Sequence, residues 1–189
     1  MLSFLQALLI HSTHRLPLPE SAVTPLENSC EVNTLPNSIL DFLLEAKRQT
    51  YASQGNDASV TPMLPGSRQL EYRNGSLFYR DIYFGVSYFV GQETVYQDEL
   101  PIWSMSYAGG VDQSILGHDD VRRIYAFLRA ALRQVSSDNP FRGHDGYRDG
   151  AYTYRNAHEG IFDAFWGNET ISRDNAIVYR LQYSGGLLR

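Results

Sequence analysis

The chain has little cysteine, little tryptophan and no excess of positive charge. Its 189 residues contain one cysteine and two tryptophans, against thirteen tyrosines. The single Cys30 cannot form an internal disulfide, which fits a reducing compartment such as the cytoplasm. The formal net charge of −5 at pH 7 argues against direct nucleic-acid binding, because phosphate contacts need a clustered positive surface. The sequence therefore predicts a cytoplasmic protein that does not itself bind nucleic acid.

The sequence also lacks the usual motifs of metal sites, cofactor sites and membrane spans. It has no His-x-x-x-His, no Cys-x-x-Cys and no Asp-rich calcium loop, so neither a metal nor a cofactor is expected. The apolar run at 2–10 is too short to span a bilayer, and it lacks the basic flank and the cleavage site of a signal peptide. No membrane association is expected.

The first part of the chain differs in composition from the rest. Four prolines stand between Pro17 and Pro36, among Ser, Thr and Asn. This pattern predicts an irregular N-terminal extension over residues 1–36. Residues 37–189 are then expected to form a single domain.

What the sequence does contain is a repeat. YRNGSLFYRD at 72–81 returns as YRDGAYTYRN at 147–156, and FVGQET at 89–94 returns as FWGNET at 165–170. Downstream, Tyr107 and Tyr183 each stand two residues before a Gly-Gly pair, and the spacing changes from 75 to 76 residues after one insertion. LLEAKRQ (43–49) and LRAALRQ (128–134) occupy corresponding places upstream. Four blocks in the same order indicate an internal duplication.

Each copy predicts a helix followed by strands. The first helix is expected to begin at Asn37-Ser38, where Ser38 and Asp41 make a capping box. The second is expected to begin near Asp119, to carry an apolar stripe as far as Val135, and to end at Asn139-Pro140.

The strands follow from hairpin signals. Asn74-Gly75 and Asp149-Gly150 predict type I′ hairpin turns, which would set Arg73 opposite Ser76, Tyr72 opposite Leu77, Leu70 opposite Tyr79 and Tyr147 opposite Tyr152. A second hairpin is predicted over 93–107 and over 169–183, with Trp103, Met105 and Tyr107 on one face. In each Tyr-Arg pair the two side chains must point to opposite faces, which leaves the arginines to pair with Glu71, Asp81 or a bound anion.

These elements predict an α+β fold made of two repeats, 37–111 and 118–189. Each repeat is a helix plus four antiparallel strands, and neither is large enough to bury its apolar face alone. The two are therefore expected to share one core around a pseudo-twofold axis. The seam between the repeats is where a small-molecule site is expected.

The same residues resemble a known family. The series YR-x-G, F-x-G-x-E-T and Y-x-G-G, set after helices that end near Arg-Gln, resembles an uncharacterised bacterial domain of unknown function over residues 38–189. Members of that family occur alone or C-terminal to a Xre-type helix-turn-helix DNA-binding domain, so the resemblance implies an association with transcription regulators. It implies no established activity. The prolines of residues 1–36 forbid two adjoining helices there, so this chain resembles the stand-alone form.

The favoured function is a small-molecule-binding or sensory domain with its ligand in the aromatic seam. Its expected lining residues are Tyr72, Tyr79, Glu93, Trp103, Tyr147, Tyr154, Glu169 and Tyr179. The repeated Glu93 and Glu169 could converge to bind a cation or divide into acid and base, or each could simply begin a strand and face water.

Two other classes stay open. An enzyme on a small polar substrate would use Glu93 or Glu169 with His144 or His158, and predicts a histidine within hydrogen-bond reach of a glutamate. A protein-interaction module without a ligand predicts a flat aromatic patch. A sensory domain predicts a mostly apolar cavity at the axis with carboxylates inside it.

Overall fold

The computed structural model describes residues 35–50 and 60–189, with side chains from residue 39 onward, and they belong to one compact unit, Thr34–Arg189. Two helices, α1 (Leu35–Gln49) and α2 (His118–Leu132), accompany eight strands. The strands are β1 (Arg68–Asn74), β2 (Leu77–Gly85), β3 (Tyr88–Gln97), β4 (Leu100–Val111), β5 (Arg148–Asp149), β6 (Tyr152–Ile161), β7 (Ala164–Arg173) and β8 (Ala176–Leu187). Within the described residues no helix is long and apolar enough to cross a membrane.

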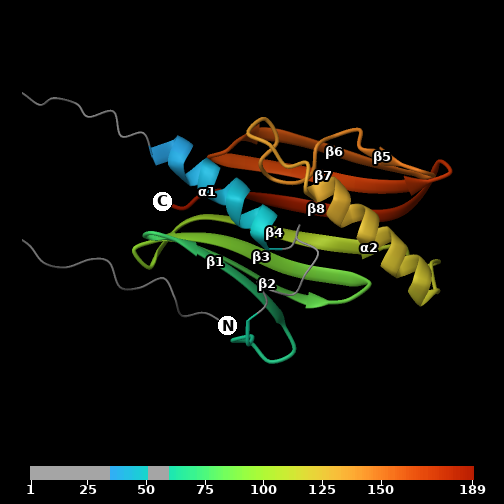
Figure 1. Cartoon of the computed structure of the whole chain (residues 1–189), viewed down its shortest axis with the longest axis horizontal. Coiled ribbons are helices and arrows are strands. Elements are labelled where there is room, and N and C mark those ends of the chain that lie inside the picture. The colour runs from blue at the N-terminus through green and yellow to red at the C-terminus, as the bar shows by residue number, and fades with distance from the viewer. Residues whose placement is uncertain (1–34, 51–59) are drawn as a thin grey trace, which may run out of the picture. The chain divides into compact units, whose positions relative to one another are not determined.

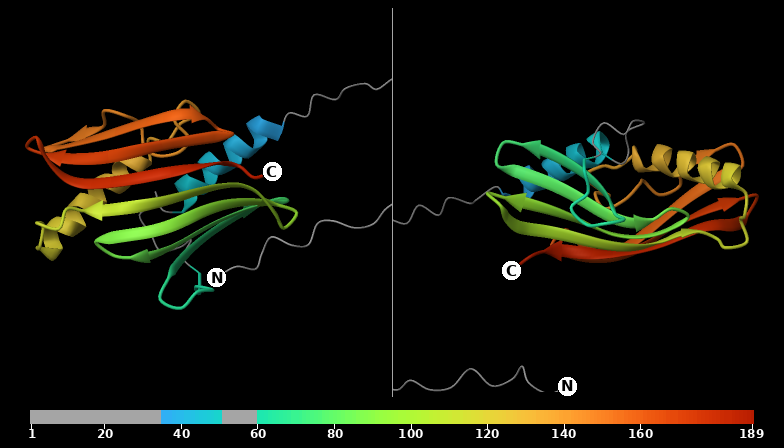
Figure 2. Two further views of the ribbon diagram at one scale, coloured as in Figure 1. Left: turned by 180° about the vertical axis from the view of Figure 1, so that it is seen from behind. Right: turned by 90° about the horizontal axis from the view of Figure 1, so that it is seen from below.

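All eight strands form one antiparallel sheet in the order β1-β2-β3-β4-β8-β7-β6-β5. The chain therefore builds two four-strand meanders, β1–β4 and β5–β8, whose last strands pair at the centre of the sheet (Figure 1). Both helices lie against the same side of the sheet, here called the helix face, and the other side is the bare face (Figure 2). The predicted α+β class is confirmed.

The helix boundaries differ from the predicted ones. α1 begins at Leu35, so Ser38 lies inside the helix and is not its cap. Pro36 does not prevent this, because a proline in the first helical turn has no intrahelical N–H bond to lose.

α2 begins at His118 after Gly117, which makes no side-chain capping bond. It ends at Leu132, well before Asn139-Pro140, because the next amides bond three residues back: Gln134 N–H to Ala131 and Val135 N–H to Leu132. These tighter bonds close the last turn and stop the helix. Val135 is nevertheless buried, as its place in the predicted stripe required.

The first hairpin of each meander has a different register from the predicted one. Tyr72 pairs with Tyr79, and Arg73 pairs with Phe78, so the loop residues are Gly75 and Ser76. Of the two, only Gly75 has a positive φ, as a type II′ turn with glycine at its first central position requires. The predicted pairings of Arg73 with Ser76, Tyr72 with Leu77 and Leu70 with Tyr79 are therefore wrong.

In the second meander Tyr152 pairs with Asp149, and the predicted pairing with Tyr147 is also wrong. Both slips move the register by two residues, so every side chain keeps the face that the alternation predicted.

The second hairpins are the ones with two positive φ angles. Asp98 and Glu99 have φ of 48° and 68°, and Asp174 and Asn175 have φ of 50° and 68°. Each hairpin also has a register irregularity, after Val95 in one meander and after Ile171 in the other. The predicted face is confirmed, since Trp103, Met105 and Tyr107 are buried and Ser106 is exposed.

The core lies between the helix face and the two helices. Five large aromatic side chains are fully buried in it: Trp103, Tyr79, Tyr154, Tyr179 and Phe141. Tyrosines bring hydroxyl groups into this core, and each hydroxyl must find a hydrogen-bond partner there. This requirement leads to the buried polar groups of the site.

Candidate functional site

Two glutamates at corresponding positions of the meanders are buried in the core. Glu93 on β3 and Glu169 on β7 each have 0% relative exposure. Neither faces water, so the plain alternative of a solvated strand start is wrong for both. A carboxylate this deep is stable only with several charged or hydrogen-bonding partners.

Glu169 has a complete set of such partners. Arg142 donates two hydrogen bonds to it, from Nη2 to Oε1 at 2.6 Å and from Nε to Oε2 at 3.1 Å. The hydroxyls of Tyr154 and Tyr179 donate to the same carboxylate at 2.5 Å and 2.8 Å. Burial and the nearby Glu169 charge raise the pKa of both tyrosines well above its ordinary value, so both stay protonated as donors.

Glu93 is held in a different way. Lys47 of α1 places its Nζ 2.7 Å from Glu93 Oε2 and donates a second hydrogen bond of 2.7 Å to the carbonyl of Phe141. Burial lowers the pKa of Lys47, and the Glu93 charge opposes this shift. Arg142 Nη1 lies 3.9 Å from Glu93 Oε1, so one guanidinium stands between the two glutamates.

A third acid, Asp81 on β2, lies beside this cluster. It is 3% exposed and accepts a 2.6 Å hydrogen bond from the hydroxyl of Tyr107. Burial, together with the Glu93 charge, raises the pKa of Asp81 to about 7, against the smaller opposing effects of Tyr107, Arg142 and Lys47. Burial thus favours the protonated form of Asp81 more than water would.

Asp81 forms part of the wall of a cavity. The cavity has a volume of about 500 Å³, with α2 on one side and strands β1–β4 on the other. Its walls are mainly apolar and aromatic, and they include Leu70, Tyr83, Phe89, Val121, Tyr125 and Leu128. Four arginines, Arg68, Arg122, Arg129 and Arg142, also line it.

In the other meander an aromatic side chain lies at the corresponding position. There the ring of Phe141 stacks on Phe165 at a centroid distance of 3.6 Å and meets the edge of His158 at 5.0 Å. By the repeated sequence blocks, Phe165 and His158 correspond to Phe89 and Tyr83, which line the cavity. Among the described residues, Phe141 thus fills the place that corresponds to the cavity of the first meander.

Asn156 corresponds in the same way to Asp81. It accepts a 2.7 Å hydrogen bond from Tyr183, as Asp81 does from Tyr107. Its amide group donates to the carbonyl of Gly143 and to Asn139 Oδ1. An amide is needed here because those neighbours offer only acceptors, whereas Asp81 faces the cavity.

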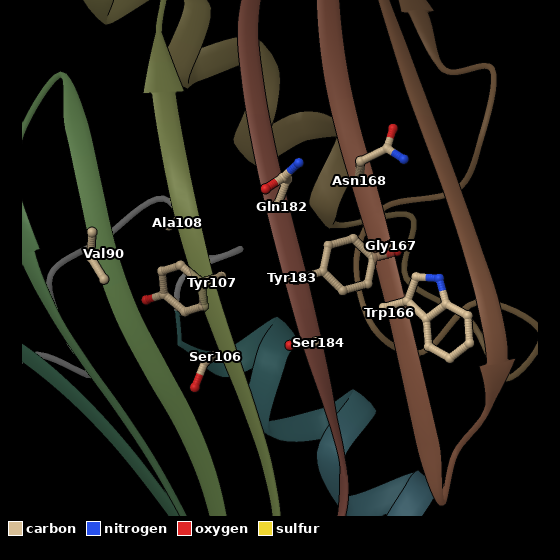
Figure 3. Close-up of a pocket in the computed structure, with 10 residues that line it drawn as sticks. All are labelled: Val90, Ser106, Tyr107, Ala108, Trp166, Gly167, Asn168, Gln182, Tyr183 and Ser184. Carbon is tan, nitrogen blue, oxygen red and sulfur yellow. The ribbon is translucent and has the colours of Figure 1, made fainter.

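A second hollow lies on the bare face, where β4 and β8 pair. Its volume is also about 500 Å³, and small side chains such as Ser106, Ala108 and Ser184 form its floor. Val90 and Trp166 stand on either side of it (Figure 3), and both are exposed. Within the described residues this hollow is lined by no charged side chain.

The predicted site residues mostly form the packed core next to the cavity. Glu93, Glu169, Tyr154 and Tyr179 belong to the buried network, and Trp103 stacks on Phe162 and Phe165. Tyr72 and Tyr147 are half-buried. The Tyr72 hydroxyl donates a hydrogen bond to Glu45, and the Tyr147 ring packs on Phe127. Tyr79 is fully buried and pairs with Tyr72 across the strands. None of the eight lines either of the two hollows.

Three residues that matter most to this arrangement were missed. Lys47 and Arg142 supply the buried cations, and Asp81 supplies the acid at the cavity. A signal existed for Asp81, because its predicted alternation with Tyr79 puts it on the buried face. The arginine row behaves as predicted at one point, since Arg80 pairs with Glu71 across the strands at 2.9 Å.

The histidines named as catalytic partners lie elsewhere. His144 is exposed, and His158 packs its ring on Phe141. In the described part of the chain, the hydrogen bonds and ion pairs of Glu93 and Glu169 involve Lys47, Arg142, Tyr154 and Tyr179, and no histidine.

Comparison with known proteins places most of the chain in a family. A family model described as "Domain of unknown function (DUF5680)" matches residues 81–188, which is over half of the chain. The match runs from Asp81 through β8, so α1 and β1 lie outside it. No curated protein and no solved structure matches the chain.

Proposed function

The chain belongs to the family described as a domain of unknown function (DUF5680), and we propose that it binds a small molecule in the cavity between α2 and strands β1–β4. The observation that carries the proposal is the cavity itself, about 500 Å³ in volume and mainly apolar, with Asp81 and four arginines in its wall. Small-molecule sites fall in this range of volume and combine apolar walls with a few polar groups that orient the ligand.

The buried ion network supports this role because it fixes the cavity wall. Arg142 lines the cavity and is also held by two hydrogen bonds to Glu169. Tyr107 lines it and donates to Asp81. Groups locked in this way stay in place before a ligand arrives, so less ordering is required when it binds.

We also propose that the domain arose by duplication and has a pseudo-twofold axis. Several observations support this. In the pairing of β4 with β8, Tyr107 lies opposite its own counterpart Tyr183. Tyr179 and Leu187 are the counterparts of Trp103 and Val111, 76 residues later in the chain. A half-turn that exchanges the two meanders therefore maps the pair Trp103–Leu187 onto the pair Tyr179–Val111. The hairpin turns with two positive φ angles, at residues 98–99 and 174–175, and the strand irregularities after Val95 and Ile171 also recur at this spacing.

The wider role is proposed from the resemblance of the sequence motifs. Bacterial relatives that carry a Xre-type DNA-binding domain would use the cavity to sense an effector. The cytoplasm is the proposed location, because a single cysteine fits a reducing compartment.

An enzyme is the second candidate, and Asp81 favours it. A carboxyl group with a pKa of about 7 at a cavity can exchange protons at neutral pH. It would take the acid–base role first assigned to Glu93 or Glu169. The test is to recover the ligand after incubation with each protein. An enzyme is favoured over a sensor if the wild type changes the ligand chemically and Asp81→Asn leaves it unchanged.

A thermal-shift screen of metabolites and charged drugs tests the binding proposal. Val121→Phe places a ring in the cavity, and Val90→Phe makes the same change beside the hollow of the bare face. Compounds that raise the melting temperature of the wild type should also raise that of Val90→Phe, but not that of Val121→Phe. The proposal fails if Val121→Phe is folded and keeps the full shift.

A further inference from the structure

We infer that the ligand of this cavity is an aromatic acid: a ring that occupies the place corresponding to Phe141, joined to a carboxylate or phosphate group that the cavity's arginines bind. The inference rests on the proposed function, since it names the chemical class of the molecule bound there.

The ring is inferred from the filled half of the molecule. Phe141 lies face to face with Phe165, 3.6 Å between centroids and 14° between planes, and edge-on to His158. In the cavity, Phe89 and Tyr83 stand at the corresponding positions and hold each other at 6.2 Å in an edge-on arrangement. A ring seated against them would gain the stacking that Phe141 gains in the other meander.

The surroundings of Phe89 complete an aromatic pocket. Tyr107 packs edge-on to Phe89 at 5.8 Å, and Tyr125 of α2 lies 5.9 Å from it. The corresponding contact in the other meander, Phe165 to Tyr183, is 6.3 Å. Both places thus set a phenylalanine against a tyrosine of the last strand, and the one beside Phe165 already holds a phenyl ring.

The acid is inferred from the charges of the wall. Four arginines line the cavity against one acid, Asp81, although the chain as a whole has a net charge of −5. Arg122 is engaged with Asp119 in an exposed ion pair. Arg68 on β1 and Arg129 on α2 are exposed and take part in none of the ion pairs found among the described residues.

Positive charge concentrated at a cavity attracts anions and disfavours cations. Guanidinium groups also match the geometry of carboxylate and phosphate oxygens, to which they can donate two hydrogen bonds. A ligand whose ring is buried and whose acid group points to Arg68 and Arg129 uses both properties of the cavity.

The test is a titration of the full chain with four naphthalene probes that differ in charge. The probes are 2-naphthoate, 2-naphthyl phosphate, 2-naphthylmethanol and 2-naphthylmethylammonium, and binding is measured by calorimetry at pH 7.5. The two anions are expected to bind at least tenfold more tightly than the alcohol, and the ammonium most weakly. The tighter anion then identifies the preferred acid group.

Arginine variants test which residues bind the acid group of the probes. Arg68→Gln and Arg129→Gln should each weaken the anions three- to tenfold and leave the alcohol unchanged. Their matched controls, Arg73→Gln on β1 and Arg123→Gln on α2, are exposed and lie outside the cavity lining, and they should change neither.

Two results would overturn the inference. If the alcohol or the ammonium binds as tightly as the anions and Val121→Phe abolishes that binding, the acid is wrong and the proposed binding function stands. If no probe binds while the thermal-shift screen finds other ligands that Val121→Phe excludes, the aromatic acid as a class is wrong. The binding function itself fails if compounds in the thermal-shift screen raise the melting temperature of Val121→Phe as much as that of the wild type.

Discussion

The two meanders share a scaffold but treat the same place in it differently. In each meander, a tyrosine of the last strand donates a hydrogen bond to a buried side chain of the second strand. Tyr107 donates to Asp81, and Tyr183 donates to Asn156. In the second meander Phe141 and Gly143 cover this position. In the first, a cavity remains. The difference suggests that one half serves packing while the other keeps space for a ligand.

The choice of side chain follows this difference. Where the neighbours are carbonyl and amide oxygens, an amide donor is required, and Asn156 provides it. Where the position borders a cavity, no such donor is needed, and Asp81 is present with a raised pKa. Three sets of variants can break or sharpen the comparison, beginning with the largest expected effect.

Removing one buried cation from each half should give the largest losses of stability. Arg142→Met leaves Glu169 without a cation, and Lys47→Met leaves Glu93 with only the longer 3.9 Å contact to Arg142. Each variant should therefore lose about 3–5 kcal/mol of unfolding free energy. Urea denaturation measures both. Adding Glu93→Gln to Lys47→Met should recover part of the loss, because no uncompensated charge is then buried. Losses below about 1 kcal/mol would show that the ion pairs do not hold the halves together.

Opening the filled half should come next in size. Phe141→Ala removes a 2% exposed ring stacked on Phe165 and should destabilise by about 3 kcal/mol or more. Val121→Ala trims a side chain that already borders the cavity and should lose about 1 kcal/mol or less. Chemical denaturation of the two variants compares the halves directly. Similar losses from both would contradict the view that only one half is filled.

Exchanging the acid Asp81 and the amide Asn156 should have a smaller effect on the free energy of unfolding, and this effect should depend on pH. In the fold Asp81 has a pKa of about 7, above its ordinary value of 3.8, so the unfolded chain loses that proton first as pH rises. Stability should therefore fall from about pH 4 to about pH 7 and then level off. Asp81→Asn should remove this decline and, at pH 8, be more stable than wild type by on the order of 1–3 kcal/mol.

The groups around Asp81 set its pKa, and the control is the reverse exchange at Asn156, the corresponding position of the other meander. Glu93 acts with burial to keep its pKa high, and Tyr107, Arg142 and Lys47 act against them. Asn156→Asp should be destabilised at every pH, and most above pH 7, because its carboxylate would face the carbonyl of Gly143. A decline with pH that survives in Asp81→Asn would assign it to another group.

Local patterns predicted most of the fold. Alternation along the strands predicted the buried face of β4 and β8. It also predicted the faces of β1 and β2 although their hairpin register was wrong, because a shift of two residues preserves the face. The turn was misplaced because Asn-Gly also fits a type II′ turn, with glycine at the first central position. The end of α2 was misplaced because the apolar pattern continues to Val135, while the amides of Gln134 and Val135 bond three residues back.

The candidate site was less predictable. The repeat drew attention to what the halves share, such as Glu93 and Glu169, and these residues form the common core. The cavity depends on what the halves do not share: the ring of Phe141, the guanidinium of Arg142 and the amine of Lys47. These contacts join residues separated by 24 positions, for Phe141 and Phe165, up to 94 positions, for Lys47 and Phe141, and no local pattern encodes them.

A crystal structure of the chain grown with 2-naphthoate tests the central claim most directly. The account predicts density for the naphthalene ring against Phe89 and Tyr125, with the carboxylate toward Arg68 or Arg129 and Phe141 unmoved in the other half. Density only in the hollow between Val90 and Trp166, or an empty cavity at saturating ligand, would contradict it.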